Sequence, residues 1–98
     1  MSGGSTALTD NYRDVLIVNQ RGLHARASAK FVQTASQYNA DISVEKDGMK
    51  VGGTSIMGLM MLAASPGCRI RVSANGPDAR AALDALEELI SARFGEEV

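Results

Sequence analysis

One short segment constrains the fold more than any other part of this chain. Residues 69–74 alternate strictly between polar and apolar side chains, with Ile70, Val72 and Ala74 on one face and both arginines on the other. Successive side chains of a strand point to opposite faces, so this pattern predicts a strand with one buried face and one face in water. Such strands are typical of antiparallel sheets. We therefore expect a sheet that is covered on one face only.

Three more segments carry strand patterns. Residues 15–18 form a β-branched run, which predicts a largely buried strand. Residues 42–45 and 49–51 alternate between apolar and polar side chains, and Asp47-Gly48 between them is a dipeptide typical of hairpin turns. These segments predict a first strand and, later in the chain, a β-hairpin.

Helical spacing of apolar and small residues marks three further segments. The first runs from Ala25 to about residue 38, and the last follows Pro77 and ends near residue 90. Between them, Ser55 is a favoured N-cap residue for a short helix that ends near residue 64. In the first helix the residues that recur at helical spacing are Ala25, Ala29, Val32, Ala35 and Ser36. The residues expected to face the core are Leu59, Leu62 and Ala63 in the short helix, and Ala79, Ala82, Leu83, Leu86, Leu89 and Ile90 in the last.

The order of these elements predicts an α+β fold of order β-α-β-β-α-β-α. Its four-stranded, mainly antiparallel sheet would be covered on one face by three helices. A chain of 98 residues fits one domain, which we place at residues 13–94 between a flexible N-terminal tail at 1–12 and a C-terminal tail at 95–98. Many functions use such a layout, so it does not identify one.

Composition narrows the setting. Ten basic and eleven acidic residues leave a formal charge of -1, so no overall field draws the chain to nucleic acid or to an anionic membrane. Cys68 is the only cysteine, which excludes an internal disulfide and a thiolate metal cluster and fits a reducing compartment. The most apolar stretch is far shorter than the roughly 20 residues of a membrane span. We expect a cytoplasmic monomer without metal, cofactor or membrane insertion.

His24 is the only histidine, and it lies where the first strand turns into the first helix. The first N–H groups of a helix lack internal acceptors and carry a partial positive charge, so they bind phosphoryl oxygens. Arg26 can add a charge-assisted contact. An imidazole nitrogen is a nucleophile near neutral pH, and a phosphoryl group on it stays reactive. The residues alone leave open the blander alternative, an ordinary cap or surface histidine, which is more frequent at such positions.

Several features of phosphoryl-transfer enzymes are missing from the sequence. It has no Gly-rich loop followed by Lys and Ser or Thr, no carboxylate pair at metal-ligand spacing and no second histidine for a proton relay. Partner proteins would have to supply metal ions and clamps. The sequence therefore favours a carrier over an enzyme.

Two motifs resemble those of one family. Gly22-Leu23-His24-Ala25-Arg26 resembles the phosphorylation-site motif of HPr, the histidine-containing phosphocarrier of bacterial phosphotransferase systems, and residues 53–60 resemble its regulatory-serine segment. The resemblance covers residues 14–92. It implies an open-faced β-sandwich, phosphorylation of His24 on Nδ1 by phosphorylated Enzyme I, and transfer to a receiving (IIA-type) domain, with Arg26 holding the phosphoryl group.

The resemblance also implies regulation at Ser55 by an ATP-dependent HPr kinase/phosphorylase. A phosphoserine adds about -1.5 to -2 charge, which would repel an acidic face of Enzyme I. Capping alone is an alternative explanation of Ser55. The chain departs from the family in having Ala27 where proline is usual, and this bears on the rate of transfer more than on the identity of the acceptor.

The short helix is apolar on all sides, so one face cannot bury every side chain. We expect Ile56, Met57 and Met60 to form an exposed partner-binding patch, together with Ala25 beside His24. Flexible methionines suit a surface that fits several partners. The alternative is that these side chains are core residues or a dimer contact.

Two other functions remain open at this stage. One is an RNA-binding module, but Phe31, Phe94, Tyr12 and Tyr38 all fall outside the predicted strands, where such a module needs stacking aromatics. The other is a regulatory relative of HPr, of the nitrogen or carbon-control type, that signals through its phosphorylation state without feeding sugar transport.

Overall fold

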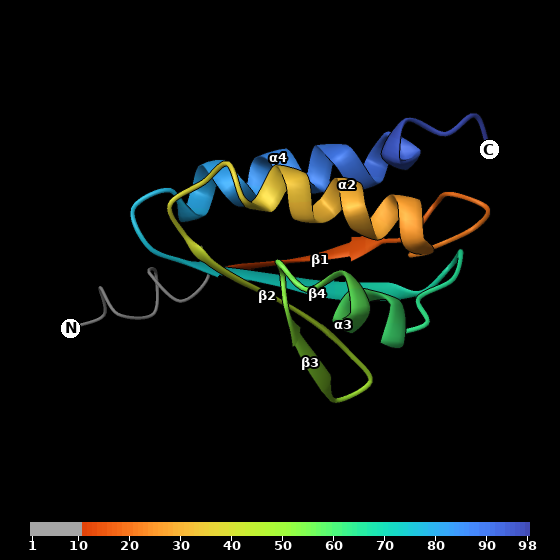
Figure 1. Cartoon of the computed structure of the whole chain (residues 1–98), viewed down its shortest axis with the longest axis horizontal. Helices are drawn as coiled ribbons and strands as arrows, with labels where there is room; N and C mark the ends of the chain where they lie inside the picture. Colours follow the sequence, from red (N-terminus) through yellow and green to blue (C-terminus); the bar gives the residue numbers. More distant parts are fainter. Residues whose placement is uncertain (1–10) are drawn as a thin grey trace.

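The structure, a computed structural model, describes residues 11–98. Its strands and helices follow one another in the predicted order, with one additional short 3-10 helix at the end (Figure 1). The elements are β1 (Tyr12–Leu16), α2 (Ala25–Ala35), β2 (Asp41–Lys46), β3 (Met49–Gly52), α3 (Ile56–Met61), β4 (Arg69–Asn75), α4 (Ala79–Ser91) and η1 (Arg93–Gly95).

The sheet is antiparallel throughout, with the strands in the order β1-β4-β2-β3. Figure 1 shows α2 and α4 lying along the same face of this sheet. On β4, Ile70, Val72 and Ala74 are buried beneath the helices, whereas Arg69 and Arg71 are exposed on the other face. The predicted one-sided sheet and the open-faced α+β architecture are therefore confirmed.

Strand β1 differs from its prediction. It begins at Tyr12 and ends at Leu16, and it alternates instead of being buried throughout, since Val15 is buried while Asp14 and Leu16 on either side are exposed. Ile17, just after the strand, is buried again. The reason is that β1 is an edge strand of a sheet with one open face, so every second side chain meets solvent. The expectation that Tyr12 lies outside the strands is wrong, and its ring lies 4.1 Å from the guanidinium carbon of Arg71.

Helix α2 is shorter than predicted and turned about its axis. It ends at Ala35, where the N–H of Ser36 bonds back to Val32, and its buried residues are Ala27, Ser28, Phe31 and Ala35. The fully buried ring of Phe31 sets the face that packs on the sheet. Ala25 and Ser36, which share the helical spacing of Val32 and Ala35, are exposed.

The other two helices agree better with their predicted faces. In α4, Ala82, Leu83, Leu86 and Ile90 are buried, as the spacing predicts. In the short helix Leu59 and Leu62 are buried, but the helix stops at Met61 and Ala63 is exposed, with φ of 53°. Backbone in that left-handed region ends the helix and turns Ala64 into the core instead.

The core lies between the helices and the covered face of the sheet. Its largest fully buried side chains are apolar and include both phenylalanines, namely Phe31, Phe94, Ile17, Leu59, Ile70, Leu83, Leu86 and Ile90. None of the helices within residues 11–98 combines the length and the apolar character that crossing a bilayer requires.

Candidate functional site

His24 is the N-cap residue of α2. Its backbone is extended, with φ of -76° and ψ of -178°, and the helix begins at the next residue, Ala25. The ring nitrogen Nδ1 accepts a hydrogen bond from the backbone N–H of Arg26 at 3.3 Å. The predicted position of His24 at a helix N-terminus is confirmed, and the structure shows in addition that Nδ1 is the nitrogen turned toward the helix.

The turn before His24 is fixed by close backbone packing. Gly22 has φ of 64°, and a Cβ placed there would lie 2.2 Å from the carbonyl oxygen of Ala64. The N–H of Leu23 donates to that same oxygen at 2.9 Å. The hydroxyl of the buried Ser28 donates to the carbonyl of Leu23 at 3.2 Å. The loop that carries His24 is thus attached both to α2 and to the segment that follows α3.

The second ring nitrogen of His24 contacts a carboxylate from the end of the chain. Nε2 lies 2.5 Å from Oε2 of Glu96, and these two side chains are only 15% and 16% exposed. The other carboxylate oxygen, Oε1, accepts a hydrogen bond from Nδ2 of Asn19 at 3.0 Å. Burial by itself would raise the pKa of Glu96, but the hydrogen bonds from Asn19 and His24 outweigh it, so the pKa lies below its ordinary value.

The C-terminal turn that carries Glu96 is held in place at three points. Phe94 is fully buried, although its φ of 54° is unusual for a residue with a side chain. Lys30 of α2 donates from Nζ to the carbonyl of Phe94 at 2.7 Å, and the N–H of Gln20 donates to the carbonyl of Val98 at 3.1 Å. Figure 1 shows this end of the chain beside the β1–α2 loop. Residues 95–98, expected as a tail, therefore include a side chain of the candidate site.

Arg26 and Ala25 lie in the first turn of α2 and are both exposed. Within the part of the chain that the structure describes, no ion pair engages the guanidinium of Arg26. Ala27 is fully buried, and α2 begins regularly at Ala25 without the proline that is usual there in the family. The first turn of α2 thus brings backbone N–H groups and one exposed cationic residue close to His24 in the chain.

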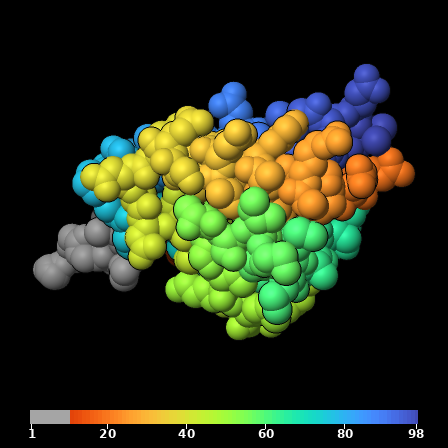
Figure 2. Space-filling view, viewed as in Figure 1, coloured from red at the N-terminus to blue at the C-terminus, as the bar shows by residue number. Residues whose placement is uncertain are grey.

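Ser55 is the N-cap of α3, and its Oγ accepts the N–H of Gly58 at 3.0 Å. The predicted capping role is confirmed, and Ser55 is exposed. Ile56, Met57 and Met60 are exposed as expected, and Met61, which the helical spacing did not single out, is 65% exposed. We call these four residues of α3 the apolar patch. Figure 2 shows the green surface of this region standing out next to the orange and yellow surface of α2.

The structure does not join Ser55 to His24 directly. No hydrogen bond or ion pair connects the two among residues 11–98, and they belong to different helix N-termini. The link between them is the packing of α2 against α3 and the hydrogen bond from Leu23 to Ala64 after α3. The predicted residues therefore lie on two helices that pack against each other, with His24 and Ser55 as two separate chemical positions.

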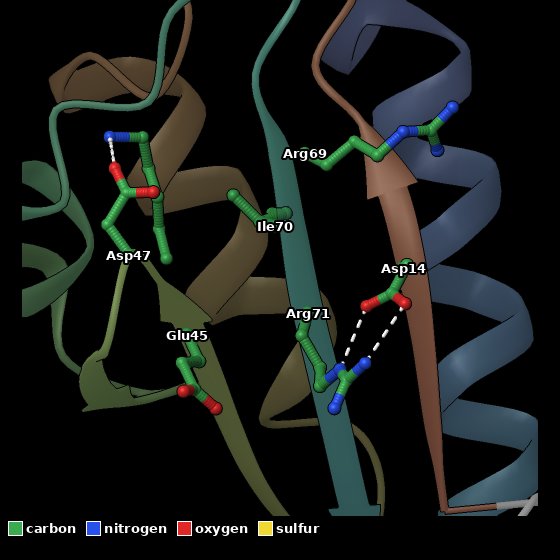
Figure 3. Close-up of a pocket in the computed structure, with 7 residues that line it drawn as sticks. Asp14, Glu45, Asp47, Arg69, Ile70 and Arg71 are labelled. Atoms are coloured by element: carbon green, nitrogen blue, oxygen red, sulfur yellow. Dashed lines mark hydrogen bonds and ion pairs between the residues drawn. The ribbon is translucent and has the colours of Figure 1, made fainter.

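A shallow pocket lies on the open face of the sheet, and Figure 3 shows its lining. Arg71 binds both carboxylate oxygens of Asp14, at 2.9 and 3.2 Å, and Lys46 pairs with Asp47 at 2.9 Å. Acidic and basic side chains are balanced there, so the pocket favours neither anions nor cations. Within the described residues, no three His, Cys, Asp or Glu side chains converge on a metal-ion site.

The sequence was compared with protein-family models and with known proteins, and the matches are to phosphocarrier proteins. The family model described as the PTS HPr component phosphorylation site matches residues 12–92. A phosphocarrier protein HPr of Neisseria meningitidis is 50% identical over 84 residues, which cover 86% of this chain and 94% of that protein. A phosphocarrier protein NPr of Shewanella violacea is 40% identical over 89 residues, covering 91% and 98% of the two chains.

A solved structure agrees as well. The crystal structure of HPr from Thermoanaerobacter tengcongensis superposes with a TM-score of 0.85 at 48% sequence identity, covering 89% of this chain and 98% of that one. The likeness therefore extends over both the sequence and the arrangement of the sheet and its helices.

Proposed function

Because this chain belongs to the HPr family of phosphotransferase-system phosphocarriers, we propose that it accepts a phosphoryl group on His24 from phosphorylated Enzyme I. It then donates the group to a IIA-type receiving domain. A phosphocarrier is an intermediate in transfer and not itself a catalyst, so the partner enzymes supply the metal ions and clamps that phosphoryl transfer needs. We place the carrier in the cytoplasm, where the free thiol of Cys68 fits reducing conditions.

The observation that carries this proposal is the position of Nδ1 at the N-terminus of α2. In the transfer step, the Nδ1 lone pair forms a bond to phosphorus while the bond to the donor breaks. The phosphoryl oxygens then meet the first-turn N–H groups, including that of Ala27, which a proline would lack. The guanidinium of Arg26 can swing onto the same oxygens. Reversal of these steps on a receiving domain releases the group.

The apolar patch and the exposed Ala25 are the surface on which we expect partners to dock. Met57 is 69% exposed and lies on the same short helix as three other exposed apolar residues, and grouped exposed apolar side chains often mark interaction sites. Methionine side chains adapt to differently shaped apolar surfaces, and a carrier must bind both a donor and a receiver. Docking here would bring the partner over the exposed first turn of α2, because α3 packs on α2.

Ser55 is proposed as a regulatory phosphorylation site for an HPr kinase/phosphorylase. Its hydroxyl is exposed and lies at the edge of the apolar patch. A phosphate there adds about -1.5 to -2 charge to a surface that is otherwise apolar, so docking of partners weakens. Incubation with such a kinase and ATP, followed by mass mapping, should locate the phosphate on Ser55, and modification at another residue would refute the assignment.

The test of the carrier function uses purified Enzyme I and phosphoenolpyruvate. We expect a phosphoryl adduct that is labile in acid and stable in base, that is absent in His24→Ala, and that passes to a IIA-type domain. Arg26→Ala should still be labelled but should transfer more slowly. Labelling of His24→Ala at the wild-type level would refute the role of His24, and wild-type kinetics in Arg26→Ala would refute that of Arg26.

One observation supports a second candidate function. The similarity to a phosphocarrier protein NPr covers 91% of this chain, so a regulatory relative that signals through its phosphorylation state is also consistent with the sequence. The two functions share the acceptor and differ in the receiving domain. To distinguish the two functions, a sugar-specific and a regulatory IIA-type domain compete for the phosphorylated protein. The domain that receives the phosphoryl group faster identifies the function.

A further inference from the structure

The side chains of Asn19, Glu96 and His24 form a continuous hydrogen-bonded chain that ends on the ring nitrogen opposite the proposed acceptor. The amide Nδ2 of Asn19 is 3.0 Å from Oε1 of Glu96, and Oε2 of Glu96 is 2.5 Å from Nε2 of His24. Glu96 and His24 are 72 residues apart in the sequence. No motif in the loop that carries His24 indicates this contact.

The two contacts of the imidazole require the same protonation pattern. A carboxylate is only an acceptor, so the contact with Glu96 places a proton on Nε2. The N–H of Arg26 is only a donor, so the contact at the other side requires a free lone pair on Nδ1. A neutral imidazole carries one proton, and the tautomer with that proton on Nε2 satisfies both contacts at once.

We propose that Glu96, held by Asn19, is a positioning residue that fixes the tautomer and orientation of His24 and so keeps Nδ1 unprotonated. The Nδ1 lone pair accepts the N–H of Arg26 in this structure and forms the bond to phosphorus when that contact opens. This inference rests on the proposed carrier function and assigns parts of the site to residues outside its motif. A carboxylate on one ring nitrogen that orients the other nitrogen is an arrangement with known catalytic value in hydrolases.

Asn19 is suited to hold the carboxylate in place. It is fully buried, and its Nδ2 donates to the carbonyl of Gly22 as well as to Glu96. Its Oδ1 has no partner within the described part of the chain. If the amide were rotated by 180°, Oδ1 would face the carbonyl oxygen of Gly22 and Oε1 of Glu96, which are both acceptors. These two acceptors therefore fix the orientation of the Asn19 amide.

The charges around the ring agree with an ionised Glu96. Arg26 lies in the first turn of α2, and Arg21 in the preceding loop favours the charged form of Glu96. The backbone before Glu96 is held by Lys30 and by the buried Phe94, and the backbone after it by the hydrogen bond from Gln20 to Val98, so the carboxylate is fixed from both sides.

The first test uses the unphosphorylated, ¹⁵N-labelled full-length chain at mildly alkaline pH. Nuclear magnetic resonance should show a ring proton on Nε2 that exchanges slowly with water, together with an unprotonated Nδ1. Glu96→Ala should lose the slowly exchanging proton, whereas Glu97→Ala, the neighbouring exposed glutamate, should keep it. An Nδ1-protonated ring in the wild type, or an unchanged signal in Glu96→Ala, would overturn the proposal.

The second test measures phosphoryl transfer from phosphorylated Enzyme I. Glu96→Ala should slow labelling about tenfold while reaching the same final extent, because the acceptor remains but is less often correctly oriented. Asn19→Ala should slow labelling in the wild-type background but not further in Glu96→Ala, since Asn19 acts through Glu96. Rates equal to those of Glu97→Ala, or additive effects of Asn19→Ala and Glu96→Ala, would refute the role assigned to each.

The two tests also separate this inference from the carrier function. If the wild type shows the protected Nε2 proton but takes no phosphoryl group from Enzyme I, the carrier function fails and the positioning geometry stands. If the wild type is labelled but lacks that proton, the carrier function stands and the positioning role of Glu96 is wrong. Thermal unfolding of each variant shows whether it is folded at the assay temperature.

Discussion

Replacing Gly22 with alanine should damage both the fold and the site, because two separate features of this position require glycine. Its φ of 64° lies in the left-handed region, which disfavours side chains. The added Cβ would also lie 2.2 Å from the carbonyl oxygen of Ala64, far inside any permitted contact. That oxygen is backbone and accepts the N–H of Leu23, so it cannot move away without breaking a hydrogen bond.

The expected magnitude follows from these two features. A left-handed residue with a side chain costs about 1–2 kcal/mol. Loss of the hydrogen bond from Leu23 to Ala64 adds about 0.5–1.5 kcal/mol, and more if the N–H stays buried without a partner. The sum for Gly22→Ala is about 1.5–3.5 kcal/mol, which for a domain of this size lowers the melting temperature by about 6–28 °C.

Gly48→Ala is the matched control. Gly48 has φ of 83°, and a Cβ at that position would meet no atom within 4 Å. Gly48→Ala should therefore show only the cost of the left-handed backbone, about 1–2 kcal/mol. Urea unfolding of both variants, followed by labelling with Enzyme I and phosphoenolpyruvate, separates the close contact from the backbone strain. If Gly22→Ala unfolds at the same urea concentration as Gly48→Ala and is labelled at the wild-type rate, the packing argument for this loop is wrong.

Two further substitutions test the core and the open face. Leu59→Ala should lower the free energy of unfolding by about 2–5 kcal/mol because it leaves a cavity, whereas Met57→Ala on the exposed side of the same helix should change it by less than about 0.5 kcal/mol in urea unfolding. Hydrogen bonds from Arg71 hold the pKa of Asp14 below its ordinary value of 3.8. The ion pair therefore contributes fully to the free energy of unfolding above pH 3.8, and this contribution is lost as the pH falls through the lowered pKa. Asp14→Asn should therefore be slightly less stable than wild type at neutral pH and low salt, and its thermal unfolding should converge with wild type in strong acid, whereas a constant difference would contradict the pairing.

The fold was accessible from the sequence wherever a pattern depended on large side chains or on strict alternation. Residues 69–74 predicted a one-sided strand because charged and apolar side chains alternate there, and the structure has β4 in that form. The leucines of α4 identified its buried face for the same reason. In α2 the small residues gave little contrast between faces, and the position of Phe31 decides which face is buried.

Parts of the candidate site could be predicted from local sequence, and other parts could not. The placement of His24 at a helix N-terminus and of Ser55 at an N-cap depends on residues that are adjacent in the chain, so local sequence was sufficient. The packing of Gly22 against Ala64 was not expected, because a glycine before a helix is compatible with many turns and only the approach of another backbone makes it necessary.

The contact of Glu96 with His24 depends on the whole fold. The C-terminal turn reaches the ring because three consecutive residues, from Arg93 to Gly95, adopt positive φ, and two of them carry side chains that disfavour such a conformation. Burial of Phe94 and the hydrogen bond from Lys30 compensate for this strain. Since both interactions need α2 and the C-terminal turn packed together, tertiary structure selects the ring nitrogen that we propose as the phosphoryl acceptor. The motif around His24 determines only that an imidazole is present at the helix N-terminus.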